Sequence, residues 1–548
     1  MNEEKKISNI ENNILNEEAV LKKEEEKIQE LKQGILGDKK IARNNSSKDK
    51  AITWLKEPSN LVLVAIMLFA FIIRIYYFWM TKNQPLWWDE LCYGSIAKNF
   101  ITHAWDGTIL IVSEMNIRPL IFPLIWAFLM FFNISEVASR FLLVFVPSML
   151  SVFFIYLAAK EIFNKRIGLI TAAIYSTMWI NLFYSSRFLV HMMDLALLFA
   201  SIYFFVKATR AEINFKHLAI SLGLLSFATL TRYPDGMIFF IYFIILILAK
   251  KLYLNKLKFW LAGIIGLSPL LLFFIINYFT RGNIFPALLG GTYLKPIQAG
   301  GQAAPFAFNV LNYMPLFLQK IFFAFFIIGL AYLLFEVFLG YNLLVKNEKL
   351  RNILLLVLIP LVFYAFFIFY LRGAEDRWLF ETILSLVIIS AAGLDIVFRY
   401  IQKYNKIIAI IFVIGILFAG GYYQITYADP LIKQKKDSYI QIQQAFYWIK
   451  DNTPKNSIII GYGIEPYAVY YADRQYDRLE LYNSSNLSDS LADYMVIHGF
   501  VPQLDYVNPY LQENQDKWKP INAFYLDVEK KQPIVIIYQR QEISNFTN

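Results

Sequence analysis

The sequence has little of what disulfide-bonded folds and transition-metal clusters require. It holds one cysteine, Cys92, and four histidines among 548 residues. A single cysteine excludes an internal disulfide and any cysteine-based metal cluster, and so few histidines argue against a histidine-rich metal site. The long, charged N-terminus also lacks an early apolar core, so we expect no cleavable signal peptide.

Apolar residues are abundant. Hydrophobic residues make up 57% of the chain and aromatic residues 17%, with a mean hydropathy of +0.44. A soluble domain cannot hide that much apolar surface, because surface-to-volume scaling leaves much of any globule wet. Many apolar runs also reach the roughly 20 residues that cross a hydrocarbon core. The sequence therefore predicts an α-helical polytopic membrane protein, in which residues 61–80 act as a retained signal-anchor.

The net charge of +10 does not indicate nucleic-acid binding. Basic residues lie in short loops between apolar runs, which is the pattern of topology signals, so we expect no nucleic-acid partner. The topology depends on residues 118–132, a short apolar run with prolines at 119 and 123. If this run spans, the downstream Lys/Arg-rich loops lie outside; if it lies at the interface, they lie in the cytosol.

The positive-inside rule favours the interfacial placement. We then expect a multi-pass protein of the cell membrane with a cytosolic N-terminus and an extracytoplasmic C-terminus. The large outer pieces are residues 81–136, 280–315 and 428–548. The eleven expected spans are 61–80, 137–159, 167–185, 194–207, 217–231, 236–250, 259–279, 316–345, 352–371, 378–398 and 407–427.

Residues 1–58 are predicted as a cytosolic charged helix with twelve Lys/Arg and twelve Asp/Glu. Apolar residues recur every seven positions, but Glu17 and Glu24 interrupt the second seam of the heptad. The pattern fits a weak coiled coil and self-association, and it fits a solvated charged helix equally well. The heptad positions are Ile7, Ile14, Leu21, Ile28 and Ile35.

The C-terminal residues 429–548 are predicted as a small extracytoplasmic α/β domain, after a transmembrane domain at residues 59–428. A helical periodicity covers 439–452, and apolar runs of strand length follow at 457–463, 493–499 and 533–539. This domain could serve as a binding module for an acceptor or a partner.

The first outer loop contains an acidic pair, Asp89 and Glu90, in "QPLWWDELCYGSIAKNF". Apolar residues follow at helical spacing, which predicts an amphipathic helix along the membrane surface. A carboxylate is favourable at a helix N-terminus. On residue chemistry alone, Asp89 is as well explained by capping this helix as by catalysis.

A second acid, Asp194, opens a predicted span on the same outer face, where a carboxylate is costly unless water, a partner or a substrate meets it. Arg118, Arg187, Arg232 and Arg377 also fall at the outer ends of apolar segments. Such arginines can snorkel or pair with a neighbouring acid, but several on one face could bind a phosphate bidentately.

Residues 285–305 are rich in glycine and proline. Such a segment is typical of a mobile lid and equally of a plain connector.

The stretch 74–100, "RIYYFWMTKNQPLWWDELCYGSIAKNF", resembles the first span and first loop of the GT-C glycosyltransferases. It is most similar to the protein O-mannosyltransferase and lipid A aminoarabinose transferase branch. The pair Arg118-Pro119 stands where aminoarabinose transferases commonly have Lys-Pro, and Arg377-Trp378 where the family often has Arg-Tyr. The likeness covers most of residues 60–427.

This resemblance implies a GT-C-like fold with interfacial helices in the first outer loop, and a sugar donor carried on a polyprenyl phosphate. Asp89 would be the general base toward an acceptor hydroxyl, and inversion would follow. Glu90 and Asp194 would help to position the acceptor, while Arg377, Arg118 and Arg232 would offset charge on the departing phosphate. No cofactor is certain and no metal ligand is assigned; a divalent cation stays open, with carboxylates as its only ligands.

Two other functions compete with this interpretation. A transporter or flippase of lipid-linked sugars would carry charges near the middle of its spans and internal repeats, whereas the charges here lie at span ends. A non-catalytic membrane scaffold would suit the heptad of the N-terminus. Oligosaccharyltransferases have a Trp-Trp-Asp motif in their soluble C-terminal domain. In this chain the similar "WWDE" lies in the first loop, at 87–90, so oligosaccharide transfer ranks low. The sequence identifies neither the sugar nor the acceptor.

Overall fold

The computed structural model describes residues 54–210, 212–286, 308–371, 375–527, 529 and 531–541. The predicted N-terminal heptad and most of the predicted lid lie outside these residues. The chain divides into two compact units between Ala65 and Ile66, and the second unit contains the candidate site and the C-terminal sheet. The predicted domain boundary near residue 428 falls inside the long helix α21 (Lys406–Lys435), so the three-domain division stays a prediction.

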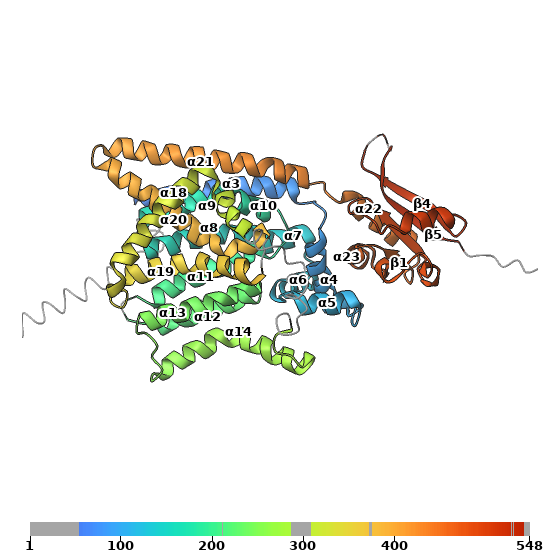
Figure 1. Ribbon diagram of the computed structural model, residues 1–548, viewed down its shortest axis with the longest axis horizontal. Coiled ribbons are helices and arrows are strands. Elements are labelled where there is room, and N and C mark those ends of the chain that lie inside the picture. Colours follow the sequence, from blue (N-terminus) through green and yellow to red (C-terminus); the bar gives the residue numbers. More distant parts are fainter. Residues whose placement is uncertain are drawn as a thin grey trace, which may run out of the picture. The chain divides into compact units, whose positions relative to one another are not determined.

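The described residues contain eight helices that are long and apolar enough to cross a membrane, or nine if one bent pair is a single span. Shorter apolar helices cover two further predicted spans, so the polytopic helical class is confirmed. Helices α8 (Val146–Ile162), α11 (His191–Ala208) and α12 (Phe215–Thr229) run side by side (Figure 1). The long helices are α3 (Pro58–Thr81), α7 to α8 (Glu136–Ile162), α11 (His191–Ala208), α14 (Leu257–Arg281), η3 to α18 (Asn309–Leu339), α19 to η5 (Glu348–Leu371), η6 to α20 (Asp376–Gln402), and α21 with α22 (Lys406–Asn452).

The shorter elements include 3-10 and π turns that join or extend these helices. They are α9 (Lys165–Thr177), α10 (Trp179–Ser185), α12 (Phe215–Thr229), η2 (Tyr233–Asp235), α13 (Gly236–Leu248), η4 (Tyr341–Leu343), η5 (Phe366–Leu371) and η6 (Asp376–Thr382).

A buried glutamine satisfies the backbone where α9 and α10 meet at a bend of 57°. The side chain of Gln424 accepts a hydrogen bond from Trp179 N and donates one to the Phe317 carbonyl, both at 2.9 Å. In hydrocarbon, a backbone polar group released from a helix must find another partner. Phe317 lies in α18 (Tyr313–Leu339), whose backbone is also non-helical at Gln319, so Gln424 supplies partners to two interrupted helices.

Helices α18 and α20 (Ile383–Gln402) cross at a pair of glycines. A Cβ atom placed on Gly393 would overlap the Phe325 carbonyl oxygen, and one on Gly329 would overlap the Ile389 carbonyl oxygen. Small residues let membrane helices approach closely enough for backbone packing. This crossing fixes α20, and with it the segment η6 that carries Arg377.

The first outer loop forms α4 (Trp88–Thr102), α5 (Ile109–Ile117), α6 (Ile121–Phe131) and the start of α7 (Glu136–Arg140). Helix α6 has 11 residues. At 1.5 Å per residue it spans about 16 Å, roughly half of a hydrocarbon core, which agrees with the interfacial placement.

The predicted helix at Asp89 is confirmed as α4, but its surroundings differ from a helix on the membrane surface. Leu91, Ile96 and Ala97 are fully buried. Helix α4 packs between α6 on one side and α23 (Glu465–Tyr467) and η7 (Ala468–Ala472) on the other. The C-terminal region therefore covers the helix that carries the acidic pair.

The C-terminal region forms a five-stranded mixed sheet in the order β2-β1-β3-β5-β4. Strands β2, β1 and β3 are parallel, whereas β5 pairs antiparallel with β3 and β4. The predicted helix and three strands are confirmed; β2 and β4 lack a continuous apolar run, which is why the sequence did not predict them. The elements are α22 (Ile440–Asn452), β1 (Ile458–Gly461), β2 (Gln475–Arg478), η8 (Leu479–Leu481), η9 (Leu487–Asp489), β3 (Tyr494–His498), α24 (Val507–Glu513), β4 (Trp518–Tyr525) and β5 (Pro533–Arg540).

Candidate functional site

A cavity of about 380 Å³ brings four of the predicted site residues together. Asp89 reaches it from α4 and Arg118 from the end of α5, while Arg232 precedes η2 and Arg377 lies in η6. The remaining wall is largely apolar. It includes Leu189, Val190, Pro234, Met237, Phe366, Phe367, Leu371 and Trp378. The cavity is therefore amphiphilic, with charged groups along one side and hydrocarbon surface along another.

Asp89 is held between two arginines. Its Oδ1 lies 2.8 Å from Arg118 Nη2, and its Oδ2 pairs with Arg377 Nη1. Burial by itself raises the pKa of the Asp89 carboxyl, but the charges of both arginines and their hydrogen bonds outweigh burial and lower the pKa to about 2. The side chain keeps 28% of its surface exposed, so the carboxylate stays accessible.

Each arginine at Asp89 has a second acidic partner. Arg118 Nε pairs with Glu114 one helical turn earlier, and its guanidinium lies 5.0 Å from the centre of the Tyr93 ring. Arg377 Nε lies 2.6 Å from Glu375 Oε2. These partners orient both guanidinium groups toward Asp89.

Asp89 does not cap α4, because Glu90 does. Glu90 Oε2 accepts a hydrogen bond from Trp87 N at 2.7 Å. Glu90 is 2% exposed and also meets Arg187, which is 2.8 Å away and stacks over Trp87 at 3.4 Å. Arg187 Nε and Phe188 N donate to the other oxygen, Oε1, at 2.9 and 2.8 Å. Every hydrogen-bonding direction of this carboxylate is used inside the protein.

Two of the predicted residues therefore form a pair outside the cavity. Among the residues that the structure describes, neither Glu90 nor Arg187 lines the cavity at Asp89. Their ion pair joins α4 to the segment between α10 and α11, and thereby holds the helix that presents Asp89.

Asp194 lies behind the cavity wall and is fully buried. Its Oδ2 is 3.6 Å from Arg232 Nη1, which is also 3.2 Å from Glu381 Oε1. Asp235 joins this group: one oxygen each from Asp194, Asp235 and Glu381 lie within 4.8 Å of one another. Arg232 connects the buried acids to the cavity that it lines.

Sequence reasoning missed Asp235 and Glu381, although both lie in segments that it singled out. Asp235 belongs to "TRYPDG" and Glu381 to "EDRWLFET", where the arginines drew attention instead of the acids. It also missed His191, which is buried and lines the cavity three residues before Asp194. The i, i+3 spacing of His191 and Asp194 was the available signal.

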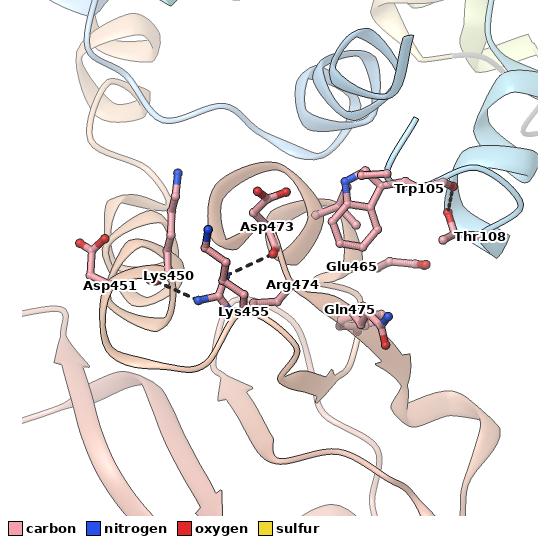
Figure 2. A pocket seen from close by; sticks show the side chains of 12 residues that line it. Trp105, Thr108, Lys450, Asp451, Lys455, Glu465, Asp473, Arg474 and Gln475 are labelled. Carbon is pink, nitrogen blue, oxygen red and sulfur yellow. Dashed lines mark hydrogen bonds between the residues drawn. The ribbon is translucent and has the colours of Figure 1, made fainter. Parts of the chain in front are cut away.

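A second cavity, of about 720 Å³, lies between the first outer loop and the C-terminal region. Figure 2 shows Trp105 and Thr108 on the first-loop side, and Lys450, Asp473 and Arg474 on the other. Arg474 donates to the backbone carbonyls of the segments that surround it, so it stabilises the loop itself. This cavity lacks Asp89 and the cavity-lining arginines among its described residues.

A family model described as dolichyl-phosphate-mannose-protein mannosyltransferase matches residues 118–275. This segment contains Arg118, Arg187, Asp194 and Arg232, but neither Asp89 nor Arg377. No curated protein sequence matches the chain.

Solved structures resemble the chain over most of its length. The archaeal oligosaccharyltransferase AglB from Archaeoglobus fulgidus, in complex with an inhibitory peptide and a dolichol-phosphate, is similar with a TM-score of 0.57 and 14% identity, over 81% of this chain and 70% of AglB. ArnT from Cupriavidus metallidurans in the apo state has a TM-score of 0.55 at 11% identity, over 89% of this chain and 98% of ArnT. ArnT bound to undecaprenyl phosphate has a TM-score of 0.52 at 11% identity, over 87% and 97%.

These likenesses show that the chain shares its polytopic helical fold with AglB and ArnT, and they confirm the predicted resemblance to the mannosyltransferase and aminoarabinose transferase branch.

Proposed function

We propose that this protein is an inverting glycosyltransferase that moves a sugar from a polyprenyl-phosphate donor to a hydroxyl acceptor on the extracytoplasmic face. The observation that carries the proposal is Asp89, an accessible carboxylate held between Arg118 and Arg377 at a cavity with an apolar wall. A lipid-linked donor has matching chemistry: an anionic phosphate joined to hydrocarbon. The N-terminus would then lie in the cytosol.

In the proposed reaction, the acceptor oxygen attacks the anomeric carbon of the donor sugar. Asp89 takes the proton of the acceptor hydroxyl as the new C–O bond forms, a contribution of typically ~10²–10⁴-fold. The bond between the anomeric carbon and the phosphate oxygen breaks on the opposite face, and the lipid phosphate leaves with the electron pair. Arg118 and Arg377 offset the charge that develops on that phosphate.

The two arginines also explain how a carboxylate with a pKa of about 2 can act as a base. In the donor-free protein both guanidinium groups serve Asp89. A donor phosphate competes for the same N–H groups, because arginine binds phosphate and carboxylate with the same planar geometry. When the donor takes those bonds, Asp89 loses the interactions that lower its pKa and becomes more basic at the moment it is needed.

The remaining predicted site residues take supporting roles in this proposal. Glu90 and Arg187 hold α4, so they position Asp89 rather than contact the donor or acceptor. Arg232 lines the cavity beside the phosphate subsite, and Asp194 keeps Arg232 in place from behind. This reassigns Glu90 and Asp194 from the acceptor, and Arg187 from the phosphate.

The printed descriptions of two similar structures support a lipid phosphate as the donor carrier. AglB was solved with a dolichol-phosphate and an inhibitory peptide, and ArnT with undecaprenyl phosphate. The acceptor class stays open between protein, lipid and glycan, and membrane lipid surrounds the spans. Self-association through residues 1–58 stays a prediction, as residues 1–53 lie outside the described part.

The decisive experiment uses the full-length protein in lipid nanodiscs with a panel of polyprenyl-phosphate sugars and membrane extracts as acceptors. The readout is release of polyprenyl phosphate. We expect Asp89→Asn to lower this release by about 10²-fold or more. The matched control Asp106→Asn, an exposed acid of the same loop, should leave it unchanged. Undiminished turnover by Asp89→Asn would contradict the proposal, and sugar movement across vesicles without donor cleavage would favour a flippase.

A further inference from the structure

Three acids from three separate elements meet in the interior behind the cavity. Asp194 belongs to α11, Asp235 to η2 and Glu381 to η6. All three are 0% exposed. Each offers one oxygen, and these oxygens lie within 4.8 Å of one another.

The charges of this cluster do not balance within the described protein. Arg232 is the cation that pairs with it, through Asp194 at 3.6 Å and Glu381 at 3.2 Å. Three carboxylates and one guanidinium leave two negative charges in a buried position, where an uncompensated charge is very costly. Something else must neutralise them, and the choice lies between two protons and one divalent cation.

The hydrogen bonding is a separate observation, and it points to a ligand. Among the described residues, the six buried carboxylate oxygens of Asp194, Asp235 and Glu381 meet no donor in regular hydrogen-bond geometry, and Arg232 lies beside two of them at 3.6 and 3.2 Å. Buried carboxylates in proteins are normally hydrogen-bonded, because an unmet buried acceptor forfeits its hydration without replacement. Acids that served only as structural partners would have backbone or side-chain donors, as Glu90 does.

The spacing suits a single hard cation. Oxygen ligands lie at about 2.0–2.6 Å from Mg²⁺ or Ca²⁺, so oxygens that share one ion are at most about 4–5 Å apart. The donor set contains oxygen alone, which favours Mg²⁺, Mn²⁺ or Ca²⁺ over zinc or copper.

We propose that Asp194, Asp235 and Glu381 bind one divalent cation of the magnesium and manganese class, in a buried site apart from Asp89. The ion neutralises the two excess charges. It ties α11, η2 and η6 together behind Arg232, and η6 carries Arg377. This site goes beyond the proposed transfer reaction, and its occupancy can be measured without any turnover.

The test uses the full-length protein in detergent, stripped with chelator, loaded with Mn²⁺, desalted and analysed by mass spectrometry for bound metal. We expect about one Mn²⁺ per chain in the wild type. The double variant Asp235→Asn/Glu381→Gln should retain about a tenth of that or less. The matched control Asp395→Asn removes a buried acid of α20 that pairs with Arg399, and it should keep the ion.

A second measurement keeps the proposal testable if the double variant does not fold. Added Mn²⁺ should raise the melting temperature of the wild type in a concentration-dependent way, because a ligand that binds only the folded state stabilises it. A wild type that retains no Mn²⁺ and melts at the same temperature with and without it would overturn the site, and would mean that protons balance the acids. Equal retention by the double variant would overturn it as well.

Asp89→Asn separates this proposal from the transfer reaction. It should lower donor cleavage by about 10²-fold or more, yet bind Mn²⁺ like the wild type. If donor cleavage depends on Asp89 but the protein binds no Mn²⁺, the proposed cation site is wrong and the transfer reaction stands. If the protein binds Mn²⁺ but its donor cleavage does not depend on Asp89, the proposed transfer reaction is wrong and the cation site stands.

Discussion

At the scale of single residues, the carboxylates of the candidate site differ in their exposure and in their ion-pair partners. Asp89 is partly exposed and pairs with two arginines. Glu90 is buried and bonded to Arg187 and to backbone N–H groups. Asp194 is buried and lies beside Arg232. Neighbours in the sequence therefore do different work. Asp89 and Glu90 are adjacent, but one faces the cavity and the other clamps the helix that carries it.

The pH dependence of the reaction should reflect the arginines at Asp89. With a pKa lowered to about 2, Asp89 is ionised in the donor-free protein at every pH above roughly 4, so kcat/KM should show no acid limb from it near neutrality. The acid limb of kcat should lie at higher pH, because the donor phosphate draws Arg118 and Arg377 away. Arg377→Gln should raise KM for the donor and move the kcat/KM acid limb upward.

Full pH–rate profiles of donor cleavage check this expectation. The control Arg281→Gln changes an arginine that hydrogen-bonds Met115 and Asn116 outside the Asp89 cavity, and its profile should match the wild type. An acid limb that stays at the same pH in Arg377→Gln would show that the arginines do not set the basicity of Asp89. Linkage gives the same sign for stability. The lowered pKa of Asp89 contributes stability above about pH 4, which is lost as the pH falls toward 2.

At the scale of elements, the site depends on helices that are clamped from several sides. Helix α4 lies between α6 and the C-terminal elements α23 and η7. Its first residue, Trp88, has a positive φ of 26°, which is unusual for a bulky side chain, and its ring packs edge-on against Tyr467. The contact across this junction holds the backbone immediately before Asp89 in a conformation that it would not otherwise favour.

The glycine crossing of α18 and α20 offers a sharp test of helix packing. Gly393→Ala should destabilise the protein by about 1–3 kcal/mol, because its Cβ atom would meet the Phe325 carbonyl and push the helices apart. The matched control is Gly415→Ala in α21, where nothing lies within 4 Å of the added Cβ atom. The control should be neutral or stabilising by up to ~1 kcal/mol, since alanine is the better helix former.

Thermal unfolding of both variants in the same detergent measures the difference. Equal melting temperatures for Gly393→Ala and Gly415→Ala would mean that α18 and α20 do not pack through their backbones. A loss of donor cleavage that accompanies the lower stability of Gly393→Ala would further link this crossing to the position of η6.

At the scale of the whole molecule, the proposed chemistry requires the first loop and the C-terminal sheet to lie on one side of the membrane and the basic loops on the other. The interfacial length of α6, with 11 residues, agrees with that topology. The packing of α4 against α23 and η7 also places the first loop and the C-terminal region together.

Cysteine labelling tests the orientation directly, because the chain has one native cysteine and it is buried. In a Cys92→Ala background, Ser484→Cys in the C-terminal region should react with a membrane-impermeant maleimide in intact cells. Lys346→Cys, in an exposed stretch between α18 and α19, should react only after permeabilisation. The reverse labelling pattern would place Asp89 in the cytosol, which would contradict the proposed reaction on the extracytoplasmic face.

Much of this protein follows from its sequence. Hydropathy alone predicted the helical membrane class, and apolar runs predicted three of the five strands. The apolar spacing after the acidic pair predicted α4, and the resemblance to GT-C enzymes singled out Asp89, which lines the cavity. These features are local, because a span or a strand requires only the right side chains at consecutive positions.

The tertiary structure decided which charges meet. Arg118 and Arg377 reach Asp89 from 29 and 288 positions away, whereas Arg187 goes to Glu90, 97 positions away. The buried acids Asp194, Asp235 and Glu381 lay in three segments whose sequences do not show that they converge. Such meetings depend on how helices cross and bend, which is set by packing across the whole bundle, and no local pattern encodes them.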